Sequence, residues 1–381
     1  MTTTAINQLS NYGQSFWYDN IQRSLITNGD LENMIKNADL RGVTSNPSIF
    51  EKAIAKSNDY DSTLARLAHE LPDASSREHF YQLAIEDIKN TADLLLPVYQ
   101  KSNKVDGYVS LEVSPDLAYK TEETVKEAKE LFARIGRPNV MIKVPATAEG
   151  VAAVEQLIAD GVNVNATLLF SVERYVEIAK AFIRGMEQRK QNGLSVDNIS
   201  SVASFFVSRV DSSLEPLLQE ILAKQSDPAL QALSGRIAII NAQCAYIEFQ
   251  KLFGSTFKAL AKAGANPQRL LWASTGIKNP DWSDVLYIES LIGDQTVNTI
   301  PPATLEAFME HGVANSTLED NIQQAKEQFA LLTKAGINVD KVMQALEDQG
   351  VASFAQSFDN LLNAIDEKIS SFKDKQGSNA A

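Results

Sequence analysis

The sequence predicts an α/β protein: a closed (β/α)8 barrel of the TIM type with additional helices, notably at the C-terminus. Short apolar runs typical of buried strands alternate with longer helical segments along the chain. Eight such runs are found, and eight parallel strands are the number that closes a barrel. No Gly-x-Gly-x-x-Gly turn follows any of them, which disfavours the alternative, an open doubly wound sheet.

The expected strands occupy residues 15–19, 41–47, 107–113, 139–145, 161–167, 199–207, 269–275 and 295–299. A helix over residues 21–38 is expected between the first two strands. Asn46 followed by Pro47 predicts a strand end that turns into a helix with proline in its first turn. Pro145 ends the fourth strand, and Thr147 and Ser171 are expected to cap the helices that follow.

The chain is longer than the barrel requires. A typical barrel takes about 250 residues, and this chain has 381. We expect one domain over residues 1–381, with a helical extension over about 302–372 and a disordered polar tail over 373–381. Phe354 and Phe358 stand four residues apart in the extension. Their spacing predicts core packing, with a lid over the barrel mouth as the alternative.

Composition narrows the function classes. A net charge of −13 argues against nucleic acid and against anionic membrane surfaces. No apolar run approaches the roughly 18 residues of a membrane span, and the N-terminus lacks signal-peptide features, so a cytoplasmic location is expected. Cys244 is interpreted as a small core residue. His69, His79 and His311 lack metal-ligand spacing, so neither metal nor cofactor is expected; His69 and His79 are expected on outer helix faces.

Lys143 lies among apolar residues in the fourth expected strand. An unpaired charge in such a strand is costly. Burial favours the neutral amine, which is the form that attacks a carbonyl carbon to give a Schiff base. The alternative is a structural lysine paired with a carboxylate inside the barrel.

Alternation along the strands separates an apolar face from a polar one. In residues 107–113, Val109, Leu111 and Val113 share one face, and Ser110 and Glu112 lie opposite. If the polar faces line the barrel, polar side chains gather at its C-terminal mouth, where barrel active sites lie. This set comprises Asp19, Asn46, Glu112, Lys143, Asn165, Thr167, Ser204 and Ser274. Each of them alone is equally compatible with a satisfied structural polar group.

Six segments resemble sequence blocks of the transaldolase family, class I Schiff-base enzymes built on a (β/α)8 barrel in the pentose phosphate pathway. In order they are GVTSNPSIF, VMIKVPATAEG, NVNATLLFS, SVASFFVSRVD, LWASTGIKNP and YIESLIGDQTVNTIPPATLEAF. The likeness extends from about residue 19 to residue 308. It implies transfer of a dihydroxyacetone unit from sedoheptulose 7-phosphate to glyceraldehyde 3-phosphate, giving erythrose 4-phosphate and fructose 6-phosphate.

The resemblance also implies catalytic roles. Lys143 would form the Schiff base, and Asp19 would remove the proton from the C4 hydroxyl of the donor. Glu112, with Thr167, would hold a water that relays protons. Read from the residues alone, Asp19 is equally a helix N-cap, and Glu112 an ion-pair partner of Lys143.

Implied substrate contacts are Asn46, Asn165 and Ser204 to the donor, Phe206 in the pocket wall, and Arg209 with Ser274 at the phosphate. The alternative for Arg209 is an exposed arginine that pairs with Asp211 or Glu215. One departure from the family concerns the second phosphate contact. Many transaldolases have an arginine two residues after the serine equivalent to Ser274; here the nearest cation is Lys278, which we assign to that contact, with a surface lysine as the alternative.

Two other functions stay in view. Fructose 6-phosphate aldolases resemble transaldolases but are shorter and have Gln and Tyr where this chain has Glu112 and Phe206. A non-catalytic barrel that binds phosphosugars is the other alternative, and the set of Lys143, Asp19, Glu112 and Thr167 counts against it. Sugar phosphates are the expected partners. The oligomeric state is left open, with a homodimer allowed.

Overall fold

The computed structural model describes residues 4–379, and its centre is a closed barrel of parallel strands in the order β1 to β8. The strands are β1 (Gln14–Tyr18), β2 (Gly42–Val43), β3 (Tyr108–Glu112), β4 (Val140–Pro145), β5 (Val164–Leu169), β6 (Ser201–Phe206), β7 (Arg269–Ala273) and β8 (Thr296–Ile300). Each strand pairs with the next, and β8 closes the barrel by pairing with β1. The predicted (β/α)8 fold is confirmed.

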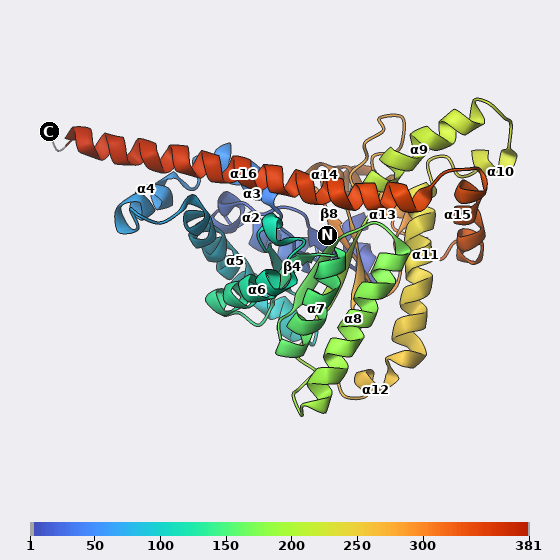
Figure 1. Ribbon diagram of the computed structural model, residues 1–381, viewed down its shortest axis with the longest axis horizontal. Coiled ribbons are helices and arrows are strands. Elements are labelled where there is room, and N and C mark those ends of the chain that lie inside the picture. Colours follow the sequence, from blue (N-terminus) through green and yellow to red (C-terminus); the bar gives the residue numbers. More distant parts are fainter. Residues whose placement is uncertain (1–3, 380–381) are drawn as a thin grey trace.

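Helices surround the barrel and cover its C-terminal end (Figure 1). Those up to β6 are α1 (Arg23–Thr27), α2 (Asp30–Asn37), α3 (Pro47–Ala55), α4 (Asp61–Glu70), α5 (Ser76–Lys101), α6 (Thr121–Ile135), α7 (Ala148–Asp160) and α8 (Val172–Gln191). Those after it are α9 (Ser208–Leu222), α10 (Pro228–Gln231), α11 (Ile237–Lys251), α12 (Lys258–Ala261), α13 (Leu286–Ser290), α14 (Pro302–His311), α15 (Ala325–Lys334) and α16 (Val339–Asn379). Short 3-10 helices are η1 (Ala5–Tyr12), η2 (Pro115–Leu117) and η4 (Ile322–Gln324), and a π-helical turn spans Leu252–Thr256.

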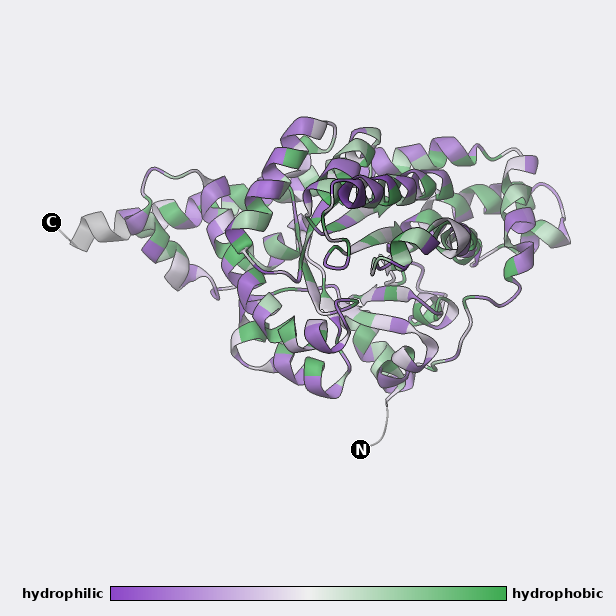
Figure 2. Ribbon diagram, turned by 90° about the horizontal axis from the view of Figure 1, so that it is seen from below, coloured by the Kyte–Doolittle hydropathy of each residue, from purple (hydrophilic) through white to green (hydrophobic). Residues whose placement is uncertain are grey.

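The sequence patterns also predict the helix starts. Asn46 caps α3 by accepting a hydrogen bond from the Ile49 N–H at 2.9 Å, and Pro47 occupies its first turn. Thr147 and Ser171 cap α7 and α8 in the same way. Hydrophilic and hydrophobic residues alternate along the outer helices (Figure 2), as expected of helices that bury one face against the barrel. Within residues 4–379, no helix is both long enough and apolar enough to cross a membrane.

Some local predictions are wrong. The expected helix over residues 21–38 is two helices, because Gly29 takes a left-handed φ of 90° that interrupts the helical backbone. The fifth strand begins later than predicted, at Val164, and runs to Leu169. His79 does not lie on an outer face: it is buried, and its Nε2 lies 3.1 Å from the Leu71 carbonyl oxygen. Helices α4, α6 and α16 all pack on α5, which leaves it little exposed surface.

The extension is helical as well, and so is the predicted tail as far as Asn379. α16 runs across the C-terminal end of the barrel and reaches α4 (Figure 1), so the extension ends in one long helix. This helix continues through Asn379, although a disordered tail was predicted from residue 373. Once a helix is nucleated, each added residue gains a backbone hydrogen bond, and a polar sequence does not prevent this. Residues 380–381 of the predicted tail lie outside the described residues.

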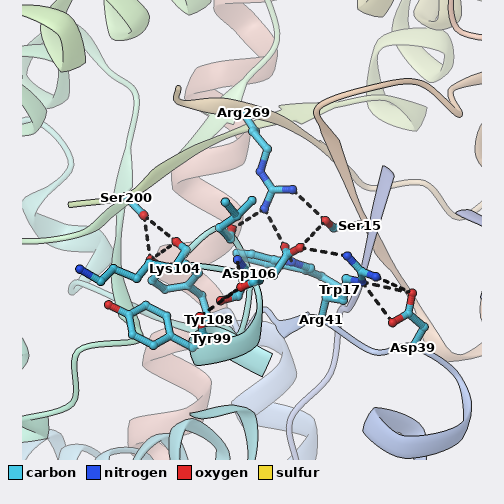
Figure 3. Close-up of polar contacts among 12 residues, drawn as sticks. Ser15, Trp17, Asp39, Arg41, Tyr99, Lys104, Asp106, Tyr108, Ser200 and Arg269 are labelled. Atoms are coloured by element: carbon cyan, nitrogen blue, oxygen red, sulfur yellow. Dashed lines mark hydrogen bonds and ion pairs between the residues drawn. The ribbon is translucent and has the colours of Figure 1, made fainter. Parts of the chain in front are cut away.

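A network of buried charges closes the opposite end of the barrel (Figure 3). Asp106, which precedes β3, accepts hydrogen bonds from Arg269 of β7 and Ser15 of β1, both at 2.7 Å. Trp17 Nε1 donates to it at 3.2 Å, and an Arg41 nitrogen lies 3.6 Å away. Because β1, β3 and β7 are not neighbours in the sheet, these contacts cross the interior. Asp106 is thus satisfied on both carboxylate oxygens and ties the N-terminal ends of the strands together.

Candidate active site

A cavity of about 490 Å³ opens at the C-terminal ends of the strands. Its lining includes these residues predicted from the sequence: Asp19, Asn46, Lys143, Ser204, Phe206, Arg209, Ser274 and Lys278. The other three, Glu112, Asn165 and Thr167, are buried in the strands beneath it. The volume is typical of a site for one small-molecule ligand. The structure therefore brings the predicted residues together around one cavity.

Lys143 stands in the middle of this arrangement. Lys143 is 4% exposed, and strand pairing places it beside Glu112 of β3 and Asn165 of β5. Its Nζ donates to the Ser45 carbonyl oxygen at 3.3 Å and lies 3.6 Å from Glu112 Oε2. The contact to Ser45 passes over β3, which shows that the side chain points into the barrel. The ion pair that the sequence left as an alternative is therefore present, and it holds the amine in the floor of the cavity.

Glu112 is buried, and burial raises its pKa to about 7. Lys143 opposes this shift and Asp19 adds to it, since a cation favours the carboxylate form and a second anion disfavours it. Neither oxygen of Glu112 has a hydrogen-bond partner among residues 4–379. A buried carboxylate with free acceptors and a pKa near neutrality can take up and release a proton at little cost.

Asp19 follows β1 and lines the cavity. Burial raises the pKa of its carboxyl group, and Lys143 and the Thr44 hydroxyl partly offset the shift. The Thr44 hydroxyl donates to Asp19 Oδ1 at 2.7 Å and also lies 2.6 Å from the Thr299 hydroxyl. This chain of hydroxyls sets the direction of the carboxylate. Helix α1 begins only at Arg23, with Gln22 as its N-cap, so Asp19 does not cap that helix.

Beneath the cavity, amide and hydroxyl groups form a polar floor. Asn165 Nδ2 donates to Ser110 Oγ at 3.1 Å, and the Ser204 hydroxyl donates to Asn165 Oδ1 at 2.6 Å. Because β3 and β5 are separated by β4, the contact between Ser110 and Asn165 crosses the barrel interior. The polar strand faces thus point inward, as predicted. Thr167 is fully buried, and its hydroxyl has no hydrogen-bond partner in the described part of the chain.

The opposite part of the cavity carries positive charge. Arg209 is in the first turn of α9, and its guanidinium lies over the Phe206 ring, 5.5 Å from its centroid. Asp211, one alternative partner of Arg209, accepts hydrogen bonds from the Tyr287 hydroxyl and the Ala238 N–H instead. Burial lowers the pKa of Arg209, and no ion pair with a carboxylate of the described residues offsets this shift.

Ser274 and Lys278 complete this end of the cavity. Ser274 has a left-handed φ of 57°, and its hydroxyl lies 2.8 Å from the Ser208 hydroxyl at the start of α9. Lys278 lines the cavity but is exposed to solvent. A hydroxyl, a fork-shaped guanidinium and a mobile ammonium together suit an anion such as a phosphate group.

Comparison with known proteins shows which family the chain belongs to. Residues 16–365 match the family described as Transaldolase/Fructose-6-phosphate aldolase. The chain belongs to that family. A protein named Transaldolase from Trichodesmium erythraeum is 44% identical over 376 residues, which is 97% of this chain and 98% of that protein. Transaldolase 2 from Nostoc punctiforme is 45% identical over 378 residues, again 97% and 98% of the two chains. Transaldolase from Thiobacillus denitrificans is 44% identical over 358 residues, or 94% and 98%.

Some residues of this transaldolase-family site were missed or read differently from the sequence. Thr44 and Thr299 orient Asp19, and Ser110 supports Asn165, yet none of them was singled out. The one sequence signal that points to Thr44 is its place two residues before Asn46, in the same motif. Phe354 was interpreted as core packing, but it lines the cavity from α16, which is the alternative that the sequence left open.

Proposed function

We propose that this protein is a transaldolase that acts in the cytoplasm, in the non-oxidative pentose phosphate pathway. It would move a dihydroxyacetone unit from sedoheptulose 7-phosphate to glyceraldehyde 3-phosphate, giving erythrose 4-phosphate and fructose 6-phosphate. The observation that carries this proposal is the Lys143 amine in the cavity floor, 3.6 Å from Glu112 and sharing the cavity with Asp19. An amine with one buried and one partly buried carboxylate near it is the set of groups that Schiff-base chemistry requires.

The first half of the reaction joins donor and enzyme. The Lys143 amine attacks the ketose carbonyl carbon to form a carbinolamine, which loses water to become a protonated imine. Both steps move protons between nitrogen and oxygen, and Glu112, with a pKa of about 7, is suited to relay them. In this proposal Glu112 and Thr167 hold the water that carries these protons, because their buried side-chain oxygens have no hydrogen-bond partner among the residues that the structure describes.

The second half breaks and remakes a carbon–carbon bond. Asp19 removes the proton from the C4 hydroxyl, the C3–C4 bond breaks, and its electron pair flows into the imine, which becomes an enamine. The aldehyde product leaves, and the enamine carbon attacks the aldehyde of the acceptor, whose oxygen takes the proton back from Asp19. The nitrogen is then the protonated imine of fructose 6-phosphate. Water adds to the imine carbon, and the carbon–nitrogen bond breaks to release fructose 6-phosphate and the Lys143 amine. The raised pKa of Asp19 makes it a stronger base than an ordinary aspartate. Asn46, Asn165 and Ser204 hold the hydroxyls of the donor and of the retained unit.

Substrate phosphate would bind at the positive end of the cavity. Arg209 supplies a bidentate grip, Ser274 a hydroxyl and Lys278 a second charge. Phe206 lines the cavity beneath the Arg209 guanidinium, and its ring packs against that of Phe170 with 5.2 Å between centroids. The distance between the imine and the phosphate would then select the length of the sugar.

The family also contains fructose 6-phosphate aldolases, which release the three-carbon unit. This chain has Glu112 and Phe206 where the resemblance places Gln and Tyr in those enzymes. A tyrosine hydroxyl in the wall can hold water or move protons near the imine, whereas a phenylalanine cannot. This difference supports transfer over release.

The test is a coupled assay with erythrose 4-phosphate and fructose 6-phosphate, followed by borohydride reduction and mass analysis of the lysines. A dihydroxyacetone-sized adduct is expected on Lys143, and Lys143→Arg should abolish both the adduct and the activity. Lys52→Arg is the matched control, because Lys52 is an exposed lysine on α3 near the cavity and should leave both unchanged. Trapping at another lysine rejects the assignment, and free dihydroxyacetone formed as readily as sugar phosphate supports the aldolase instead.

A further inference from the structure

A second, much smaller cavity lies beside Glu112. Its volume is about 10 Å³, which is close to the space that one water molecule needs. Asn46 lines both this small cavity and the large one, whereas Glu112 lines the small one. Among the described residues that line the small cavity, Glu112 is the only one that titrates. Its carboxyl group therefore borders both this space and the Lys143 amine, 3.6 Å away.

Three phenylalanine rings close the small cavity on the side of the helices. They belong to Phe50 of α3, Phe80 of α5 and Phe358 of α16, and these residues are between 1% and 4% exposed. The Phe80 ring packs edge-to-face on the other two, with 5.3 Å between centroids to Phe50 and 5.4 Å to Phe358. Because the rings come from three helices, the wall is complete only with α16 in place.

Phe358 is the ring of this wall that borders solvent. The Arg77 guanidinium lies over it, 5.5 Å from the ring centroid, and the Arg77 side chain is 40% exposed and pairs with Asp116. Helix α16 packs on α3 and α5 at this point (Figure 1). The Ser357 hydroxyl lies 2.7 Å from the Ser48 hydroxyl of α3, which holds the helix there. Phe358 thus contacts an exposed cation and also lines the cavity beside Glu112.

We propose that Phe358 is a positioning residue for the reaction, whose ring closes the small cavity to bulk water and to Arg77, so that Glu112 exchanges protons only on the side of Lys143. This inference rests on the proposed transaldolase function and gives α16 a part in its proton relay. An apolar ring offers no hydrogen bond to a carboxylate, so it leaves the ionised form of Glu112 without solvation on this side.

The pKa of Glu112 is where this closure acts. Burial is the main cause that raises the pKa to about 7; Lys143 of β4 opposes the shift, and Asp19 after β1 adds to it. Those two charges stay in place when the Phe358 ring is removed. Water and the positive charge of Arg77 would then reach the carboxylate, and both favour its ionised form. The pKa of Glu112 should therefore fall in Phe358→Ala.

The expected shift can be stated as a rate ratio. We expect Phe358→Ala to lower the pKa of Glu112 from about 7 to about 6, which is part of the way back to its ordinary value of 4.5. At pH 6 about half of the variant molecules would then carry the carboxylate, against about a tenth of the wild-type molecules. The variant therefore gains rate at acidic pH relative to its own plateau. A helix that is merely loosened does not produce such a gain.

The experiment measures adduct formation on Lys143 with fructose 6-phosphate, by borohydride quenching of the full-length protein between pH 5 and 9. Phe358→Ala should raise the ratio of the rate at pH 6 to the rate at pH 9 about fivefold. Phe358→Met refills the wall with an apolar side chain and should keep the wild-type ratio. Leu361→Ala is the matched control: it is three residues further along α16, is 0% exposed and lines neither cavity. It should leave the ratio unchanged.

A second measurement follows the same proton without substrate. The infrared C=O band of protonated Glu112 is identified by its absence in Glu112→Gln. Its midpoint should move from about 7 in the wild type to about 6 in Phe358→Ala. If the wild type forms no lysine adduct, the proposed function fails. If the adduct forms and the infrared midpoint does not move, only the role of Phe358 fails.

Each remaining outcome decides the proposal. A ratio that rises in Phe358→Ala but not in Phe358→Met or Leu361→Ala supports it. An equal rise in Leu361→Ala overturns it, because loosening of α16 would then be the cause, and an equal rise in Phe358→Met overturns it, because an apolar side chain would then not suffice. If Phe358→Ala does not fold, Phe358→Val opens the wall with a smaller loss of packing and is read in the same way.

Discussion

The titration of Glu112 gives the sharpest prediction. Burial raises its pKa from 4.5 to about 7, so at pH 6 only about a tenth of the molecules carry the carboxylate. If the ionised form relays protons during imine formation, the rate should rise about tenfold per pH unit below 7 and level off above it. Glu112→Gln keeps the shape of the side chain but cannot ionise. It should abolish this inflection and lower the plateau rate by about 10² to 10⁴-fold.

The same shift has a consequence for stability, with a definite sign. Because the pKa is higher in the folded state, Glu112 holds its proton more tightly there. Its stabilising contribution is fully present below pH 4.5 and is lost as the pH rises through about 7. The difference between 4.5 and about 7 corresponds to a loss on the order of 3 kcal/mol. Glu112→Gln should remove this pH-dependent loss.

Rates of adduct formation, measured by borohydride quenching between pH 5 and 9, test the first part, and urea unfolding over the same range tests the second. Asp87→Asn is the control: Asp87 is a buried carboxyl whose pKa is also raised, to about 6, but it pairs with Arg23 and does not line the cavity. It should leave the rate inflection in place. An unchanged rate profile in Glu112→Gln would remove Glu112 from the proton relay.

Four further variants test three separate parts of the molecule. Asp19→Ala should still form the borohydride-trapped adduct on Lys143 but lose carbon–carbon cleavage by about 10² to 10⁴-fold, and full turnover would exclude it as the base. Arg209→Lys should raise KM for phosphorylated acceptors by about tenfold or more but not for unphosphorylated glyceraldehyde, with Lys278→Met having the smaller effect; the reverse order would contradict the assignment. Asp106→Asn leaves a buried arginine unpaired and should lower the free energy of unfolding at pH 7 by about 3 to 5 kcal/mol. Burial raises the pKa of Asp106, but its charged and hydrogen-bonded partners outweigh burial and lower the pKa overall, so the stabilising contribution of Asp106 is lost as the pH falls through this lowered pKa. Urea unfolding that shows equal stability of variant and wild type at pH 7 would refute the prediction.

The strands and the charged and polar groups that they bring to the cavity could be predicted because they depend on local patterns. Alternation along residues 107–113 assigns Glu112 to the inner face, and the paired positions Glu112 and Lys143 then follow from parallel strands in register. Asn46 and Pro47 likewise predict the start of α3, because asparagine caps helices and proline suits the first helical turn. Strand alternation and helix caps depend on a few neighbouring residues, so they can be predicted without knowledge of the rest of the fold.

The remaining features depend on contacts between distant segments. The bonds from Thr44 to Asp19 and to Thr299 require the barrel to close, which no local pattern encodes. Phe354 and Phe358 have the same spacing signal, yet one faces the cavity and the other packs on α5. Which of the two points into the mouth is decided by where the helix crosses the barrel, and that crossing is set by anchors on other helices.

Charge balance within the barrel explains why these groups can remain buried when the protonated imine forms. The Lys143 nitrogen carries one positive charge both as an ammonium and as a protonated imine, at nearly the same place beside Glu112. The carboxylates therefore keep their counter-ion when the covalent intermediate forms, and no charge has to be created in a medium of low dielectric constant. With Asp19 also ionised, the three groups would carry one excess negative charge. Burial is the main cause that raises the pKa of Glu112 to about 7, and the negative charge of Asp19 adds to it. A proton on Glu112 removes this excess charge, and with a pKa of about 7 the group can both accept and donate a proton near neutral pH.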